Sequence, residues 1–347
     1  MKAKKRLSTI GIGVLFAVAL FFISSVAMAD PIALKYSDPS PPTPARAKAV
    51  KAWGDWLEKE TGNEIKIEYY WSNSLAKAKD NINATKGGIA DMCMNSSFGY
   101  HKAVFPIWQF SELLMLGGAD WGAHSRTVKE LYETVPVLKK EIDKTGLKLV
   151  AMFGIHPTMF MTKKPVHKLE DFKGMRIRAI GSMADWLKSI DATPTGMTIY
   201  ETYEALQKGL LDGTQSYMYI NAPMKMNEVT KYGILPGIQN ITMSVWMNKK
   251  VYKKLSAKTK KIIDEQAWDK ANDLVIAAWD ADYDKSVAAG KAAGIEFITI
   301  EGAEMARWKE SVQGSVHEKW LSNMKEKGVD GQAILDKYAE IYKKYQR

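Results

Sequence analysis

The order of apolar strands and amphipathic helices near the start of the chain constrains the fold most. Strands are predicted at residues 32–37, 65–71 and 89–95, and helices at 45–61 and 75–86 lie between them. A β-α-β-α-β order is typical of a parallel sheet covered by helices. We therefore expect an α/β protein.

The loops that follow these three strands are the first candidates for a binding site. They span Asp38–Pro42, Trp71–Asn73 and Ser96–Tyr100. Ligands of such sheets bind beyond the carboxyl ends of the strands. Aromatic side chains here and near a later predicted strand could line a mostly apolar pocket, or could simply belong to the core. They are Trp71, Phe98, Tyr100, Tyr217 and Tyr219.

A short predicted strand within Lys173–Ser182, KGMRIRAIGS, carries two arginines. Side chains alternate between the two faces of a strand, so Arg176 and Arg178 are expected on the same face. Either that face is exposed to water, or at least one arginine binds an anion. Alternation alone leaves both readings open.

Two later segments predict long helices. Residues 123–144 are expected to form one helix. Residues 256–289 contain no glycine and no proline, and a single helix of that length would be about 51 Å long. Such a helix would run across two domains or break near Asp280–Asp284. Two ordinary helices are the alternative.

The first 29 residues have the pattern of a secretory signal. Lys2, Lys4, Lys5 and Arg6 precede an apolar run, which ends at Ala27-Met28-Ala29. We expect cleavage after Ala29 and export of the mature chain. An uncleaved membrane anchor is the alternative, because the apolar run is nearly long enough to span a bilayer.

The charge and the cysteine content of the sequence argue against nucleic-acid binding and against an intramolecular disulfide. The formal net charge is +10, and removal of the four basic residues of the signal lowers it to +6. The lysines are scattered and no arginine-rich arm is present, so we do not expect nucleic-acid binding, whereas attraction of small anions fits. The single cysteine, Cys93, allows no intramolecular disulfide, and its apolar neighbours predict a buried thiol.

Motifs for catalysis or metal binding are missing from the sequence. It has no Gly-rich phosphate loop, no HExxH, no paired CxxC and no GxSxG, and its five histidines are dispersed. We therefore expect no catalytic residues, no metal and no cofactor.

Several stretches, in this order and spacing, resemble the periplasmic solute-binding subunits of TRAP transporters, the DctP-like family. The strongest match is Leu169–Arg178, which resembles the family pattern D-L-K-G-L-K-I-R. The other stretches that carry the resemblance are Ala45–Gly62, Gly87–Met92, Val104–Trp108 and Glu204–Gly213. Together they extend over nearly the whole mature chain.

The resemblance implies a two-domain periplasmic binding protein fold of α/β type, with crossing strands, an interdomain cleft and a long helix that packs on both domains. Residues 1–29 would be the signal peptide. Residues 30–154 and 238–280 would form domain I, and residues 155–237 and 281–347 would form domain II.

The resemblance also implies a function that is not enzymatic. Such a protein captures a small organic acid in the periplasm and delivers it to the small and large permease subunits in the membrane. We expect a monomer. An ABC-type substrate-binding protein, or a secreted enzyme that acts on an organic acid, are the alternatives.

By the same resemblance, Arg178 falls on the family arginine that clamps the ligand carboxylate, while Arg176 falls on a position that the family does not reserve for ligand. The aromatic candidates favour a monocarboxylate with an apolar or aromatic tail, or a 2-oxo acid. The predicted ligand-binding residues are Arg178, Trp71, Ser97, Phe98, Tyr100, His156, Ser216, Tyr217, Tyr219 and Asn221.

Overall fold

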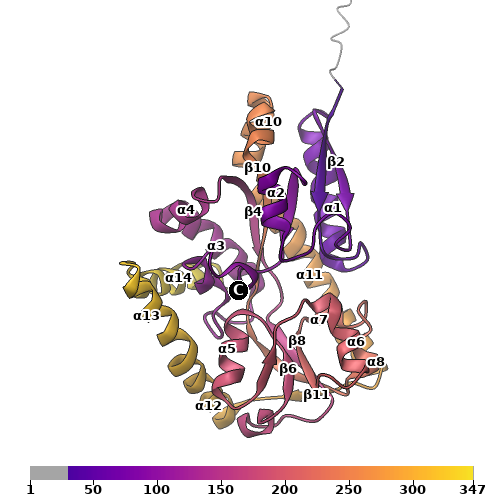
Figure 1. The fold of residues 1–347 in the computed structure, drawn as a ribbon, viewed down its shortest axis with the longest axis vertical. Coiled ribbons are helices and arrows are strands. Elements are labelled where there is room, and N and C mark those ends of the chain that lie inside the picture. Colours follow the sequence, from indigo (N-terminus) through magenta and orange to yellow (C-terminus); the bar gives the residue numbers. More distant parts are fainter. Residues whose placement is uncertain (1–29, 347) are drawn as a thin grey trace, which may run out of the picture. The chain divides into compact units, whose positions relative to one another are not determined.

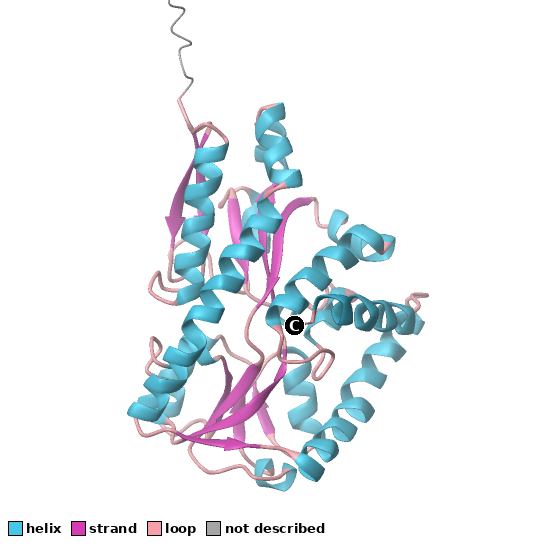
Figure 2. Ribbon diagram, turned by 180° about the vertical axis from the view of Figure 1, so that it is seen from behind, coloured by secondary structure: helices cyan, strands magenta, loops and turns pink. Residues whose placement is uncertain are grey.

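The computed structural model describes residues 30–346. The predicted signal segment, its cleavage after Ala29 and the alternative of a membrane anchor all fall outside these residues. From Pro31 onward the chain forms one compact unit, in which helices surround two sheets (Figures 1 and 2). Within the described residues, no helix has the length and apolar character that crossing a membrane requires.

The first sheet contains the three strands that open the α/β pattern. Its strands are β1 (Ile32–Ser37), β2 (Ile65–Tyr70), β3 (Met92–Asn95), β4 (Leu147–Gly154) and β10 (Thr242–Asn248), in the order β2-β1-β3-β10-β4. β1 pairs in parallel with β2 and β3, as the sequence predicts. β10 enters antiparallel between β3 and β4, so the sheet is mixed.

The second sheet is built from later parts of the chain. Its strands are β5 (Thr158–Thr162), β6 (Arg176–Arg178), β7 (Thr193–Thr195), β8 (Gly213–Ser216), β9 (Tyr232–Gln239) and β11 (Glu296–Thr299), in the order β11-β9-β5-β8-β6-β7. The strand with the two arginines, β6, lies between β7 and β8 and runs parallel to both.

Two short connections join the sheets, at residues 155–157 between β4 and β5 and at residues 240–241 between β9 and β10, and the chain passes a third time between β10 and β11. The two short connections link a strand of one sheet directly to a strand of the other. The predicted domain boundaries stay a prediction, because the chain from Pro31 onward forms a single compact unit.

Helices α1 (Ala45–Glu60) and α2 (Asn81–Gly87) follow β1 and β2. α1 agrees with the predicted helix, but α2 is shorter than predicted at its start. Ser72 and Asn73 have positive φ angles, and the Asn73 side chain accepts a hydrogen bond from the backbone N–H of Ala78. The segment before α2 is therefore a series of turns rather than helix.

The helix predicted at residues 123–144 is two helices, α3 (Trp121–Thr134) and α4 (Pro136–Asp143). Val135 between them is extended, with φ −111° and ψ 99°. A residue that precedes proline is pushed out of the helical region, so Pro136 ends one helix and begins the next.

The glycine-free segment forms α10 (Ala257–Glu265) and the 26-residue helix α11 (Ala267–Ala292). The break falls at Gln266 and not near residues 280–284. α11 contacts α1, α3 and β4 beside the first sheet and α7 (Met218–Asn221) beside the second. The predicted long helix that packs on both parts is thus confirmed, although it starts at Ala267, eleven residues later than expected.

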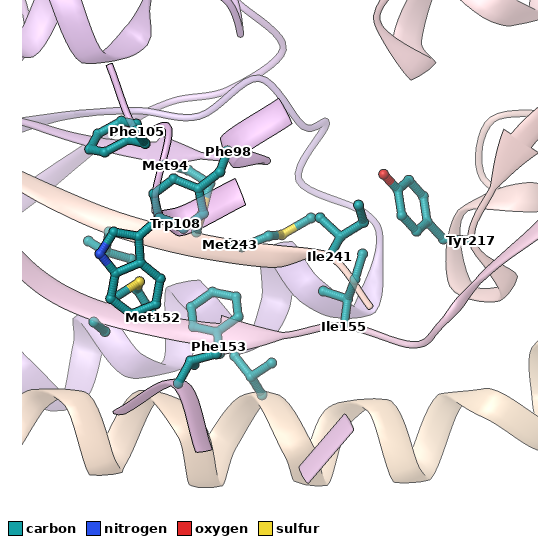
Figure 3. Packing of buried hydrophobic residues seen from close by; sticks show 14 of the residues in the cluster. Met94, Phe98, Phe105, Trp108, Met152, Phe153, Ile155, Tyr217, Ile241 and Met243 are labelled. Atoms are coloured by element: carbon teal, nitrogen blue, oxygen red, sulfur yellow. The ribbon is translucent and has the colours of Figure 1, made fainter. Parts of the chain in front are cut away.

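Tryptophans fix α11 to the first sheet. The indole N–H of Trp268 donates to the Met152 carbonyl at 2.7 Å, and that of Trp279 donates to the Gly154 carbonyl at 3.2 Å. Figure 3 shows the core above α11, in which Phe98, Phe105 and Trp108 pack together. Cys93 is also fully buried here, and burial raises the pKa of its thiol to about 12.

The remaining helices complete the covering of the sheets. They are α5 (Gly181–Ser189), α6 (Thr202–Gln207), α8 (Met226–Val229), α9 (Lys249–Lys254), α12 (Gly302–Val312), α13 (Glu318–Glu326) and α14 (Gly331–Tyr345). Short 3-10 turns lie at Phe98–His101, Trp108–Glu112, Leu169–Phe172 and Ile199–Glu201, and a π-helical turn lies at Gln313–His317.

Candidate functional site

Arg178 ends β6 and is fully buried. Its Nε donates to the Met197 carbonyl at 2.8 Å, its Nη1 to the Gln215 carbonyl at 3.2 Å, and its Nη2 to the Tyr100 hydroxyl at 3.0 Å. All three acceptors are neutral, and no carboxylate among the described residues pairs with this guanidinium. A guanidinium has five N–H donors, so these bonds leave one on each terminal nitrogen.

Arg176 has a different environment, although it lies on the same strand. Its side chain is 45% exposed, and its Nε and Nη2 bind the two carboxylate oxygens of Asp212 at 3.0 and 2.9 Å. The sequence interpretation that Arg176 is a surface residue is confirmed. Alternation along the strand does not predict this difference in burial. Arg176 is exposed, whereas Ile177 and Arg178 are both buried.

Tyr100 brings the end of the first sheet to Arg178. It belongs to the turn Phe98–His101 that follows β3, and the preceding loop is held by the buried carboxylate of Glu112. That carboxylate accepts from the Ser97 hydroxyl at 2.7 Å and from the backbone N–H groups of Phe98 and Gly99 at 2.7 and 3.1 Å. Burial outweighs these bonds and raises the pKa of Glu112 to about 7.

The same loop touches the start of α5. A Cβ atom placed on Gly99 would lie 3.2 Å from the Cα atom of Gly181, and Gly181 has a φ of +60°. The Ser182 hydroxyl donates to the Glu112 carbonyl at 2.5 Å across the same contact. Two glycines thus let the strand end of the first sheet meet the helix that follows Arg178 in the second sheet.

Tyrosines gather beside Arg178. Tyr217 and Tyr219 are buried, and their ring centroids lie 5.8 Å apart. Burial raises the pKa of Tyr217, while the charge of Arg178 acts in the opposite direction. Burial also raises the pKa of Tyr200 to about 12. The charge of Arg46 acts in the opposite direction, while Asp38 and Tyr100 act in the same direction as burial.

Arg46 and Asp38 form a buried ion pair near these tyrosines. Arg46 Nη1 and Nη2 bind the two Asp38 oxygens at 2.9 and 2.6 Å, and neither side chain is more than 1% exposed. Burial opposes the charge of Arg46, but Asp38 outweighs it and the pKa of Arg46 is raised. This pair joins the loop after β1 to the start of α1.

His156 lies in the first crossing between the sheets and is fully buried. Its Nε2 lies 3.3 Å from the Trp279 carbonyl, and its Nδ1 has no hydrogen-bond partner among the described residues. Aromatic rings surround it, with centroids 4.5 Å away at Trp121 and 6.3 Å away at Tyr219. Burial lowers the pKa of His156 to about 4.

The other predicted residues divide into two groups. Ser216 donates its hydroxyl proton to Asn221, so these two side chains satisfy each other just after β8. Trp71 and Phe98 make aromatic packing contacts: Trp71 stacks on Tyr69 at 5.1 Å, and Phe98 stacks on Trp108 at 5.7 Å in the core (Figure 3).

Sequence reasoning missed several residues of this site: Asp38, Arg46, Glu112, Met197, Tyr200 and Gln215. The sequence does hold a signal for Asp38, because this residue begins the loop Asp38–Pro42 that follows the first predicted strand. No pattern indicates that Met197 supplies a backbone carbonyl. Among the described residues, no group of three or more His, Cys, Asp and Glu side chains is placed to hold a metal ion.

Comparison with known proteins gives a consistent result. A family model for bacterial extracellular solute-binding proteins, family 7 (DctP), matches residues 37–323. The C4-dicarboxylate-binding periplasmic protein DctP of Rhodobacter capsulatus is 25% identical over 307 residues, which cover 87% of this chain and 91% of that protein.

Solved structures agree. A TRAP periplasmic solute-binding protein from Desulfovibrio salexigens is 29% identical, with a TM-score of 0.78, and the match covers 92% of this chain and 97% of that one. A marine metagenome TRAP solute-binding protein specific for aromatic acid ligands, in complex with metahydroxyphenylacetate, is 26% identical, with a TM-score of 0.83 and coverage of 91% and 100%.

The fold with its two sheets and bridging helix, the family model over most of the chain, and these relatives agree with the motifs found in the sequence. They exclude the alternatives of a secreted enzyme and of an ABC-type protein. The chain belongs to the DctP family of TRAP periplasmic solute-binding proteins, which bind their ligands without catalysis.

Proposed function

We propose that this protein binds a small organic monocarboxylate, whose carboxylate group is held by Arg178, and delivers it to the two membrane subunits of a TRAP transporter. The unsatisfied charge of Arg178 carries this proposal. A buried cation is costly unless an anion compensates it. Arg46 and Arg176 each hold a carboxylate of the protein, whereas Arg178 contacts neutral acceptors only.

The geometry of a guanidinium suits this ligand group. One N–H donor remains on each terminal nitrogen of Arg178, and a carboxylate has two oxygens that accept such a pair of hydrogen bonds. The Tyr100 hydroxyl, which accepts from Nη2, still has a proton to donate to a ligand oxygen.

The surroundings of Arg178 favour one carboxylate rather than two. A dicarboxylate would need a second unpaired cation, but Arg46, the other buried arginine near the tyrosines, is occupied by Asp38. Tyr100, Tyr200 and Tyr217 offer flat apolar rings with polar tips, which suit an aromatic or branched tail. The marine relative, solved also with 3-hydroxybenzoate at 25% identity, supports an aromatic acid.

Closure of two domains around the acid would complete the binding cycle. We propose domain I as residues 30–154 and 238–280, domain II as residues 155–237 and 281–347, and bending at the two crossings between the sheets. Of the predicted ligand contacts, we retain Arg178, Tyr100 and Tyr217 as the inner group. We further propose that the signal is cleaved after Ala29, which frees the mature chain in the periplasm.

A thermal-shift screen tests the ligand class, because a bound ligand raises the melting temperature by mass action. We expect 3-hydroxybenzoate and 3-hydroxyphenylacetate to raise the melting temperature, and the uncharged 3-hydroxybenzamide to leave it unchanged. A rise with succinate or malate and none with the aryl or branched acids would overturn the proposed ligand class.

A further inference from the structure

A pocket of about 400 Å³ lies where three distant segments meet: the residues after the Phe98–His101 turn, the first turn of α5, and α13. α5 packs against the π-helical turn that leads into α13, which holds these walls together (Figure 1). Arg178, Tyr100 and Tyr217 do not line this pocket. Its volume falls within the range of small-molecule sites.

The charged residues of the pocket are unbalanced. Asp185 on α5 forms ion pairs with Lys102 at 3.0 Å and with Lys319 at 3.4 Å, so one carboxylate pairs with two ammonium groups. Lys327 adds a third positive charge to the lining. Three lysines against one aspartate leave an excess of two positive charges within the pocket, which attracts an anion.

The floor of the pocket is apolar. Leu113, Trp320 and Met324 line it, and each is at most 5% exposed. The indole N–H of Trp320 donates to the Pro106 carbonyl at 3.2 Å, which fixes the ring in place. A flat hydrocarbon body would therefore remove apolar surface from water here, while its charged end stays at the lysines on the rim.

The walls come from both sides of the contact between the two sheets. The Lys102 ammonium also reaches the Gly181 carbonyl at 3.4 Å, and Ser182, which lines the pocket, bonds to the Glu112 carbonyl. A molecule in the pocket would touch both walls. Its binding energy would therefore favour the conformation in which they meet.

We propose that this pocket is a second binding site, separate from Arg178, for a small organic anion with a flat apolar body. The anionic group binds among Lys102, Lys319 and Lys327. There it partly replaces Asp185 as the ion-pair partner of Lys102 and Lys319. The exposed Lys–Asp pairs present no large barrier to this exchange, because such surface ion pairs contribute little to stability.

The experiment uses the fluorescent anion 8-anilinonaphthalene-1-sulfonate as the probe. The titration is made on the full mature chain with Arg178→Gln, so that the proposed primary site does not contribute. We expect saturable fluorescence enhancement, and we expect the double variant Lys319→Glu/Lys327→Glu to bind the probe at least about tenfold more weakly.

Matched variants decide the outcome. Lys325→Glu/Lys343→Glu makes the same change in net charge at exposed lysines outside the pocket and should keep the affinity for the probe. Trp320→Phe should lower energy transfer from tryptophan to the bound probe. Non-saturable binding, equal loss in both double variants, or unchanged energy transfer would each overturn the second site. None of these results bears on Arg178, which is replaced throughout.

Discussion

The Arg178 guanidinium donates a hydrogen bond to the Tyr100 hydroxyl at 3.0 Å, and this bond joins the strand end of one sheet to the strand end of the other. Tyr100 follows β3, and Arg178 ends β6. A ligand carboxylate held by Arg178 would therefore contact groups from both sheets.

Loss of Arg46 should destabilise the protein strongly. Arg46→Met leaves the Asp38 carboxylate buried without its partner, and we expect the free energy of unfolding to fall by about 3–5 kcal/mol. Urea denaturation at pH 7 measures it. Lys51→Met breaks the exposed pair with Asp55 and should cost no more than about 1 kcal/mol. Equal losses in the free energy of unfolding would show that the buried pair stabilises the protein no more than the exposed pair.

His156 should make the protein less stable in acid. Because burial lowers its folded pKa to about 4 from an unfolded value near 6.5, the unfolded chain binds the proton more tightly. Stability from this group is complete above about pH 6.5 and falls as the pH drops toward 4. Between pH 7 and pH 4.5 we expect a loss of about 2–3 kcal/mol.

Denaturation of His156→Gln at both pH values checks this prediction. The variant should lose that much less stability than the wild type on acidification, whereas the exposed control His167→Gln should follow the wild type. An unchanged pH dependence in His156→Gln would mean that His156 does not supply the acid sensitivity.

Side chains added at the contact between the sheets should weaken ligand binding. Gly99→Ala places a Cβ atom 3.2 Å from the Gly181 Cα and 3.0 Å from the Ser97 hydroxyl oxygen, closer than such contacts usually are. The two walls would have to separate, so we expect lower affinity with a folded protein. Gly196→Ala meets nothing within 4 Å and is the control. Calorimetry that gives equal affinities for both variants would contradict this role of the contact.

The sequence predicted much of the architecture because its patterns reflect local physics. The parallel arrangement of β1, β2 and β3 followed from helices between apolar strands. The split of residues 123–144 into two helices also has a local cause, Pro136. The apolar periodicity by itself does not reveal this break. The break at Gln266 had no such signal, because neither glycine nor proline marks it.

The candidate site was less accessible to sequence reasoning. Arg178 was identified through a motif, since period-2 alternation treats it and Arg176 alike. What separates them is tertiary: Asp212 reaches Arg176 at the strand's start, and Met197 and Tyr100 enclose Arg178 at its end. The pairing of Arg46 with Asp38 likewise depends on how α1 folds back on the loop before it.

Calorimetric titration of the acid that raises the melting temperature most, into three proteins, tests the role of Arg178 most directly. Arg178→Gln should weaken binding at least about thirtyfold, because the carboxylate loses its buried partner. Arg176→Gln should stay close to the wild type, since its guanidinium serves Asp212 at the surface. Cooperative melting of the ligand-free variants confirms that they are folded. Wild-type affinity in folded Arg178→Gln, or an equal loss in both variants, would contradict the carboxylate clamp.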